Sequence, residues 1–253
     1  MTASLALGPT PDVPLSRVNP VAQIVATVVV SLVLLSTLDA VTPAVVVAAE
    51  LCLLPAAGLT APRVLLLRTW PLLLSALTVG LVNLVLGDSG PLTALGIALR
   101  VIGLALPGVL LVASTDPVRL ADALIVHWRF PPRFAVGALA ALRLAPLLVT
   151  EFETVRLARR TRGVETGRNP VAQARAFAGV AFTLLIGAVR RAGRLATAMD
   201  ARGFDSGVPR TNARGSVLHT RDTLFVAGAV LVGAVAVTTS VLTGAFDPLF
   251  VGG

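Results

Sequence analysis

Residues 131–163 read PPRFAVGALAALRLAPLLVTEFETVRLARRTRG, and residues 170–203 read PVAQARAFAGVAFTLLIGAVRRAGRLATAMDARG. Each segment opens on proline, which suits the first turn of a helix, and closes on glycine, which suits the residue just past a helix end. The pattern therefore predicts one helix from Pro131-Pro132 to Gly163 and another from Pro170 to Gly203. Each would hold about 30 residues and extend about 45 Å, because a helix rises about 1.5 Å per residue.

Both segments end on a small or polar residue, an arginine and a glycine: Thr161-Arg162-Gly163 and Ala201-Arg202-Gly203. A glycine in the left-handed conformation stops a helix, so the arginine before it projects from the helix end. Such an arginine is able to enter an acidic groove and form paired hydrogen bonds with carboxylates. The alternative is an ordinary C-terminal charge that complements the helix dipole.

The two predicted helices are amphipathic, with arginines along one side. Their apolar faces include Leu144 and Leu147 on the first, and Phe182 and Leu185 on the second. A basic amphipathic helix binds anionic lipid, nucleic acid or an acidic protein. Nucleic acid is disfavoured, because no aromatic residues are interleaved with the arginines and membrane spans flank the block.

The composition is that of an integral membrane protein. Hydrophobic residues make up 55% of the 253 residues and charged residues 13%, and the mean hydropathy is +0.87. A soluble domain carries about 25% charged residues. Five apolar runs have the length of a span, which is about 17–25 residues. They are Val21–Leu38, Ala40–Leu59, Trp70–Leu86, Leu92–Ala113 and Leu224–Leu242.

The fold class expected is therefore all-α, a polytopic membrane protein with about five transmembrane helices and two long cytoplasmic helices. Two shorter apolar runs, Phe134–Val149 and Ala176–Val189, are interpreted as faces of the long amphipathic helices. Each is also a possible span, so the range is five to seven.

The positive charge sets the orientation. All 21 basic residues are arginine, against 13 acids, which gives a net charge of +8. A cytoplasmic N-terminus places 20 of the 21 arginines inside, in agreement with the positive-inside rule. The chain then divides into four spans (residues 1–113), a cytoplasmic block with the long helices (114–222) and a last span with an outside tail (223–253). Only Arg100 falls within a span, and Glu50 is a possible charge partner.

Motifs of catalysis are missing from the sequence. No histidine pair is spaced for zinc, and a phosphate-binding loop with lysine is impossible in a chain without lysine. We therefore expect no cofactor and no enzymatic activity. Two alternatives remain open: an integral membrane enzyme of lipid or peptide metabolism, and a stand-alone permease that binds its own substrate. Both would need polar clusters inside the membrane.

Four segments resemble the T component of energy-coupling-factor transporters, the transmembrane coupling subunit of certain vitamin and metal-ion importers. They are Leu15-Ser16-Arg17-Val18-Asn19-Pro20; Ser114-Thr115-Asp116-Pro117 with Pro131-Pro132-Arg133; Leu142-Arg143-Leu144-Ala145-Pro146-Leu147 with Thr161-Arg162-Gly163; and Met199-Asp200-Ala201-Arg202-Gly203-Phe204. Two positions depart from the family pattern: Gln23 replaces a basic residue, and Thr161 replaces an alanine.

The resemblance implies a multi-pass protein of the plasma membrane that transmits ATP-driven motion within an importer of a vitamin, cobalt or nickel. Two cytoplasmic ABC ATPase subunits would bind the ends of the two long helices at Thr161, Arg162, Gly163, Ala201, Arg202 and Gly203. A membrane-embedded S component, which binds the substrate, would contact Leu144, Leu147, Phe182 and Leu185. The chain itself would neither hydrolyse ATP nor hold the substrate.

Overall fold

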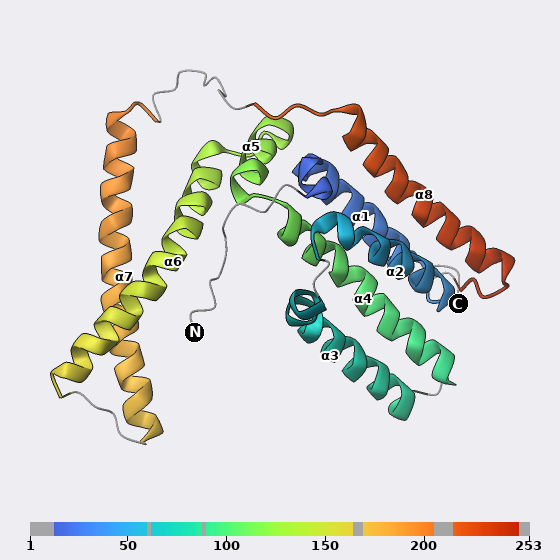
Figure 1. The fold of residues 1–253 in the computed structure, drawn as a ribbon, viewed down its shortest axis with the longest axis horizontal. Coiled ribbons are helices and arrows are strands. Elements are labelled where there is room, and N and C mark those ends of the chain that lie inside the picture. The colour runs from blue at the N-terminus through green and yellow to red at the C-terminus, as the bar shows by residue number, and fades with distance from the viewer. Residues whose placement is uncertain (1–12, 60–61, 88–89, 164–168, 205–214, 248–253) are drawn as a thin grey trace. The chain divides into compact units, whose positions relative to one another are not determined.

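The computed structural model describes residues 13–59, 62–87, 90–163, 169–204 and 215–247. These residues form eight α-helices and two short 3₁₀ helices (Figure 1). The chain separates into two compact units. Of the described residues, 13–59, 62–87, 90–131 and 215–247 form a helical bundle, and 132–163 and 169–204 form the other unit.

The bundle unit contains six α-helices. They are α1 (Pro20–Ser36), α2 (Val41–Leu53), α3 (Pro62–Leu86), α4 (Gly90–Ser114), α5 (Pro117–Trp128) and α8 (Thr220–Leu242), with 3₁₀ helices η1 (Pro14–Arg17) and η2 (Pro55–Ala57). Helix α4 is central, because it packs against α1, α2 and α3. Helix α8 packs against α1 and α2, so the last span returns to the first two. Leu34 and Val46 are fully buried where these helices meet.

Three helices begin in the same way, on an asparagine or aspartate followed by proline and valine. The side chains of Asn19, Asp116 and Asn169 accept hydrogen bonds from the backbone N–H two residues later, at 3.0, 2.8 and 3.0 Å. Each cap satisfies one of the free donors at a helix start, and the proline that follows has none to satisfy. Asp116 is therefore the N-cap of α5, and the same arrangement starts α1 and α7 (Pro170–Ala201).

Among the described residues, five helices are long and apolar enough to cross a membrane, which is the number expected; three of them match predicted spans and two do not. The segments are 69–86 in α3, 90–114 in α4, α6 (Pro132–Thr161), α7 and α8. Helix α1, with 17 residues, is at the lower limit of span length, and α2, with 13 residues, is below it. The two segments interpreted from sequence as amphipathic faces are thus of spanning length and composition, although arginines gather toward their C-terminal ends.

The predicted span over Ala40–Leu59 is wrong as a single helix. Helix α2 ends at Leu53, a 3₁₀ turn follows at Pro55–Ala57, and Gly58 adopts the left-handed conformation at φ 74°. Proline breaks the helix because it lacks an N–H and clashes with the preceding turn. The 13 residues of α2 extend about 20 Å, short of the roughly 30 Å hydrocarbon core.

Glycines allow the bundle helices to approach closely. A Cβ atom added at Gly96 of α4 would lie 2.8 Å from the Ala40 Cα, and one added at Gly233 of α8 would lie 2.8 Å from the Val33 Cγ2 of α1. Small residues at such contacts are typical of membrane helix packing, where van der Waals contact replaces the hydrophobic effect as the driving force.

We expect Gly96→Ala to lower the melting temperature of the purified protein in detergent. The new methyl group would overlap the backbone of Ala40, and overpacking of this kind costs about 1–3 kcal/mol. Gly108 is the matched control, because it lies on the same helix and an added Cβ meets nothing within 4 Å. Gly108→Ala should be neutral or stabilising, since alanine favours the helix by about 1 kcal/mol. Equal melting temperatures for the two variants would contradict the close contact at Gly96.

Candidate functional site

The helix pair α6–α7 has the bounds that its prolines and glycines predict. Helix α6 runs from Pro132 to Thr161 and α7 from Pro170 to Ala201. Few of its side chains are buried: Ala135 in α6 and Val180 in α7 are the ones below the surface. The pair therefore has almost no core of its own, and its stability in isolation cannot come from internal packing.

Both helices end as the sequence predicts. Gly163 and Gly203 adopt the left-handed conformation, at φ 77° and φ 73°. At the end of α7 the N–H of Phe204 donates to the carbonyl of Met199, and the N–H of Gly203 donates to the carbonyl of Asp200. These two bonds form a Schellman motif, which closes the helix and turns the chain away at once.

Arg162 and Arg202 are exposed at these two ends, as are Thr161, Gly163, Ala201 and Gly203. Neither guanidinium group has a hydrogen-bond or ion-pair partner within the described part of the chain. The arginine side chains are not needed to cap the helix ends, because carbonyls in the last turn of each helix accept hydrogen bonds from backbone N–H groups of the same turn. Each arginine thus keeps its five N–H donors available for another molecule.

The two helices cross in opposite directions, and polar contacts hold the crossing. Arg159 donates to the Gly179 carbonyl at 2.9 Å and to the Thr183 hydroxyl at 3.3 Å. Nearer the middle of α6, Arg191 donates to the Glu151 carboxylate at 2.5 Å. Because Glu151 pairs with the later residue of α7 and Arg159 with the earlier one, the helices are antiparallel where they touch.

Figure 1 shows that the C-terminal ends of α6 and α7 lie at opposite ends of the crossed pair, and Arg162 and Arg202 directly follow or lie at these ends. The contacts span residues 151–159 of α6 and 177–191 of α7. From the middle of these contacts to the two tips, the path along the helices is about 40 Å at ~1.5 Å per residue. A single binding groove on one partner protein is too short to hold both arginine tips, whereas two separate partner proteins could each bind one tip.

Much of the apolar surface of the pair is uncovered. Phe182 is 63% exposed, Leu185 58% and Leu147 45%, while Leu144 is half-buried. Exposed apolar residues of this number on two helices mark a surface that lipid or another protein covers. The four residues predicted to contact an S component are thus on the surface, and a contact with that partner stays a prediction.

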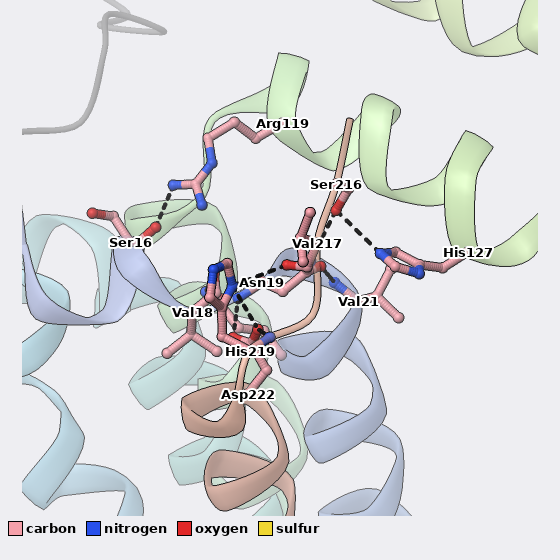
Figure 2. A network of polar contacts seen from close by, with 11 residues as sticks. Ser16, Val18, Asn19, Val21, Arg119, His127, Ser216, Val217, His219 and Asp222 are labelled. Carbon is pink, nitrogen blue, oxygen red and sulfur yellow. Dashed lines mark hydrogen bonds and ion pairs between the residues drawn. The ribbon is translucent and has the colours of Figure 1, made fainter. Parts of the chain in front are cut away.

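A polar network fixes the segment through which the chain returns from the pair into the bundle (Figure 2). The buried carboxylate of Asp222, near the start of α8, accepts from the backbone N–H of Asn19 and of His219, both at 2.7 Å. The Asn19 amide also donates to the Ser216 hydroxyl at 2.8 Å. Ser216 in turn lies 3.2 Å from the Nε2 atom of His127 in α5.

This network joins three parts of the chain that lie far apart in sequence. Residues 216–222 precede and begin α8, Asn19 begins α1, and His127 lies in the last turn of α5, just before the chain enters α6. The end of α5 and the start of α8 are therefore held together within the bundle. Sequence reasoning singled out Asn19 as part of a motif and did not connect it to Asp222.

The intramembrane arginine has a different partner from the one considered. The Arg100 Nη2 atom donates to the carbonyl of Thr37 and lies 3.5 Å from that of Asp39, at the α1–α2 connection. Asp39 Oδ2 accepts from Thr42 N–H at 2.7 Å and from the Ser240 hydroxyl at 2.7 Å. Burial raises the pKa of Asp39, but these hydrogen bonds outweigh it and hold the pKa below its ordinary value. Arg100 thus ties α4 to α1, and Glu50 is left out of this cluster.

The sequence is similar to one family and to several named transport proteins. The profile of the CbiQ family, described as a cobalt transport protein, matches residues 12–213. Proteins named energy-coupling factor transporter transmembrane protein EcfT are similar over a shorter range. That of Staphylococcus aureus (strain 04-02981) is 33% identical over 144 residues, 54% of each chain. That of Exiguobacterium sibiricum is 33% identical over 59% of this chain and 60% of its own, and that of Bacillus subtilis (strain 168) is 28% identical over 58% of each. The alignments thus cover little more than half the length of these relatives.

Proposed function

We propose a function from the premise that this chain belongs to the CbiQ family of cobalt transport proteins. It is a multi-pass membrane protein, and its resemblance to T components of energy-coupling-factor transporters is confirmed. On this basis the chain is the transmembrane coupling subunit of such an importer. It transmits ATP-driven motion of cytoplasmic ATPase subunits to an S component that binds a vitamin or a metal ion.

The observation that carries this proposal is the geometry of the two arginine tips. Arg162 and Arg202 are exposed and end their helices in the same way, and the antiparallel contacts of α6 and α7 place these two helix ends at opposite ends of the pair. Two ATPase subunits, one at each tip, suit this arrangement. Each guanidinium group would form paired, charge-assisted hydrogen bonds with carboxylates in a groove of its ATPase.

The exposed apolar surface of α6 and α7 is the proposed contact with the S component, through Leu144, Leu147, Phe182 and Leu185. When the ATPase subunits close or open around ATP, the two tips move, and this surface moves with them. The network around Asn19 and Asp222 holds the end of α5 and the start of α8 together in the bundle. The chain itself would act as a mechanical link and not as an enzyme or a stand-alone permease.

The proposed topology has a cytoplasmic N-terminus in the plasma membrane, with both tips in the cytoplasm. Its basis is the arginine distribution. In a Cys52→Ser background, a cysteine at Thr161 or Leu218 should react with an impermeant thiol reagent only from the cytoplasmic side. One at Thr243 should react from outside. Labelling of Thr161→Cys from outside would mean that α6 crosses the membrane and would refute the proposed docking.

Co-purification with ATPases is the direct test of the function. The affinity-tagged chain, co-expressed with the two ATPases and the S component of the same cells, should retain all of them in detergent. Vesicles that contain the whole complex should take up substrate only when ATP is present on the side of the membrane where the ATPases lie. The chain purified alone should hydrolyse no ATP. Uptake by vesicles that contain this chain without any ATPase would favour the permease alternative.

A further inference from the structure

A second feature of the bundle is a cavity of about 320 Å³ lined by α1, α2, α4 and α8. Its walls are almost entirely apolar, with Ala26, Val30, Val46, Leu110, Phe225 and Val232 among the lining residues. Glu50, in the last turn of α2, supplies the charged group of the wall.

Glu50 is buried without a partner. The residue is only 5% exposed, and neither oxygen of its carboxylate has a hydrogen-bond partner within the described residues. A buried ionised carboxylate is costly unless a cation pairs with it. An ionisable residue inside a membrane bundle is for that reason a candidate binding residue.

The polar groups near Glu50 are already engaged. The Gln23 amide nitrogen donates to the carbonyls of Leu15 and Val18, at 2.9 and 3.3 Å. Its oxygen accepts from the hydroxyls of Ser114 and Thr115, each at 3.1 Å. Arg100 is bonded to the α1–α2 connection instead. None of the described residues that line the cavity is an arginine or histidine, so this part of the chain provides Glu50 with no counter-ion there.

We propose that this cavity binds an amphiphile with one ammonium group and a short apolar body, and that the ammonium group pairs with Glu50. The cation offsets the cost of the buried carboxylate, and the apolar body fills the apolar walls. The volume is at the lower end of small-molecule sites, which suits a short chain. A zwitterionic lipid head group fits poorly, because its phosphate would find no cation in the wall. This inference concerns the bundle and does not depend on the proposed coupling function.

Chemical labelling of Glu50 in the purified full-length chain, reconstituted in vesicles, tests the site. Dicyclohexylcarbodiimide partitions into apolar sites, where a carboxylic acid adds across one of its C=N bonds. The O-acylisourea then rearranges to an N-acylurea without a leaving group, so the peptide gains the full mass of the reagent. We expect mass spectrometry to find this adduct at Glu50, and Glu50→Gln to abolish it.

The choice of competitor tests the ammonium group. N,N-Dimethyloctylamine, protonated at neutral pH and unable to form an amide, should slow labelling of Glu50 about tenfold at ten times its dissociation constant. 1-Octanol, at an equal concentration in the membrane, should leave the rate unchanged. Absence of the adduct in folded protein would overturn the proposal, and so would equal protection by the alcohol.

A cavity-filling variant separates the site from general membrane effects. Gly228 lines the cavity, and a Cβ added there meets nothing within 4 Å. Gly228→Leu should therefore fill the cavity and remove the protection by the amine. Gly108→Leu is the matched control, since Gly108 is equally open but lies outside the lining. Unchanged protection in Gly228→Leu would show that the amine binds elsewhere. Both variants must elute as monodisperse protein for the comparison.

Discussion

We expect substrate uptake to fall to background when Arg162 and Arg202 are both replaced by alanine, while the amount of protein in the membrane stays normal. Loss of one arginine from a buried, hydrogen-bonded charge pair typically costs about 2–5 kcal/mol of binding free energy. That is a weakening of about 30-fold to several thousandfold for a single replacement. The tips lie too far apart to share partners, so the two losses should add.

The matched control is Arg160→Ala. Arg160 is exposed in the last turn of α6, two residues before Arg162, and carries the same charge. If the arginines only complement the helix dipole, both positions should matter equally and weakly, by about 0.3–1 kcal/mol. Under the docking proposal, Arg160→Ala leaves ATPase co-purification and uptake nearly normal. Arg→Lys at either tip should restore binding only in part, because lysine keeps the charge but cannot form the paired bonds.

The second large effect is expected at Asp222. Asp222→Ala should lower the free energy of unfolding by about 1–3 kcal/mol for the buried N–H of Asn19, which loses its acceptor, and by a smaller amount for the part-buried N–H of His219. The side chain is only 2% exposed, so water cannot readily replace it. The measurement is unfolding by sodium dodecyl sulfate in mixed micelles, followed by circular dichroism. Asp222→Asn keeps one acceptor oxygen, so its free energy of unfolding should lie between those of the wild-type protein and Asp222→Ala.

Asp116→Ala provides the control for this prediction. Asp116 accepts one backbone N–H, that of Val118, at the start of α5, and it lines the same polar cavity of about 490 Å³ as Asp222. Loss of a single N-cap costs about 1 kcal/mol. Equal destabilisation by the two alanine variants would mean that Asp222 is an ordinary cap and that it does not hold α1 to α8.

Local signals in the sequence predict the parts of this structure that depend on neighbouring residues. The bounds of α6 and α7 follow from Pro132, Pro170, Gly163 and Gly203, since proline and glycine act on the backbone within a turn. The extent of α2 was missed, because an average of hydropathy gives Pro55 no weight although it ends the helix.

Contacts between distant residues were beyond the reach of such signals. Asn19 and Asp222 are 203 positions apart and meet only because α8 packs beside α1. In the same way, Arg100 and Glu50 look like partners as the two opposite charges in predicted spans. The fold instead brings Arg100 to Thr37, 63 positions away, and places Glu50 at an apolar cavity. Charge alone could not decide between these pairings.

The crossing of α6 and α7 makes the pair a lever with unequal arms. Measured from the middle of the contacts, the arm to Arg162 is about 10 Å and the arm to Arg202 about 27 Å, at ~1.5 Å per residue. A rotation of about 10° about the crossing would therefore move the Arg162 tip by roughly 2 Å and the Arg202 tip by roughly 5 Å, given these arm lengths. An equal displacement at each tip would rotate the pair through different angles. A displacement at the short α6 arm gives the larger rotation, and a force at the long α7 arm gives the larger torque. Spin-label distances from the bundle to Thr161 and to Ala201 through the ATP cycle would show whether the two amplitudes differ in this ratio.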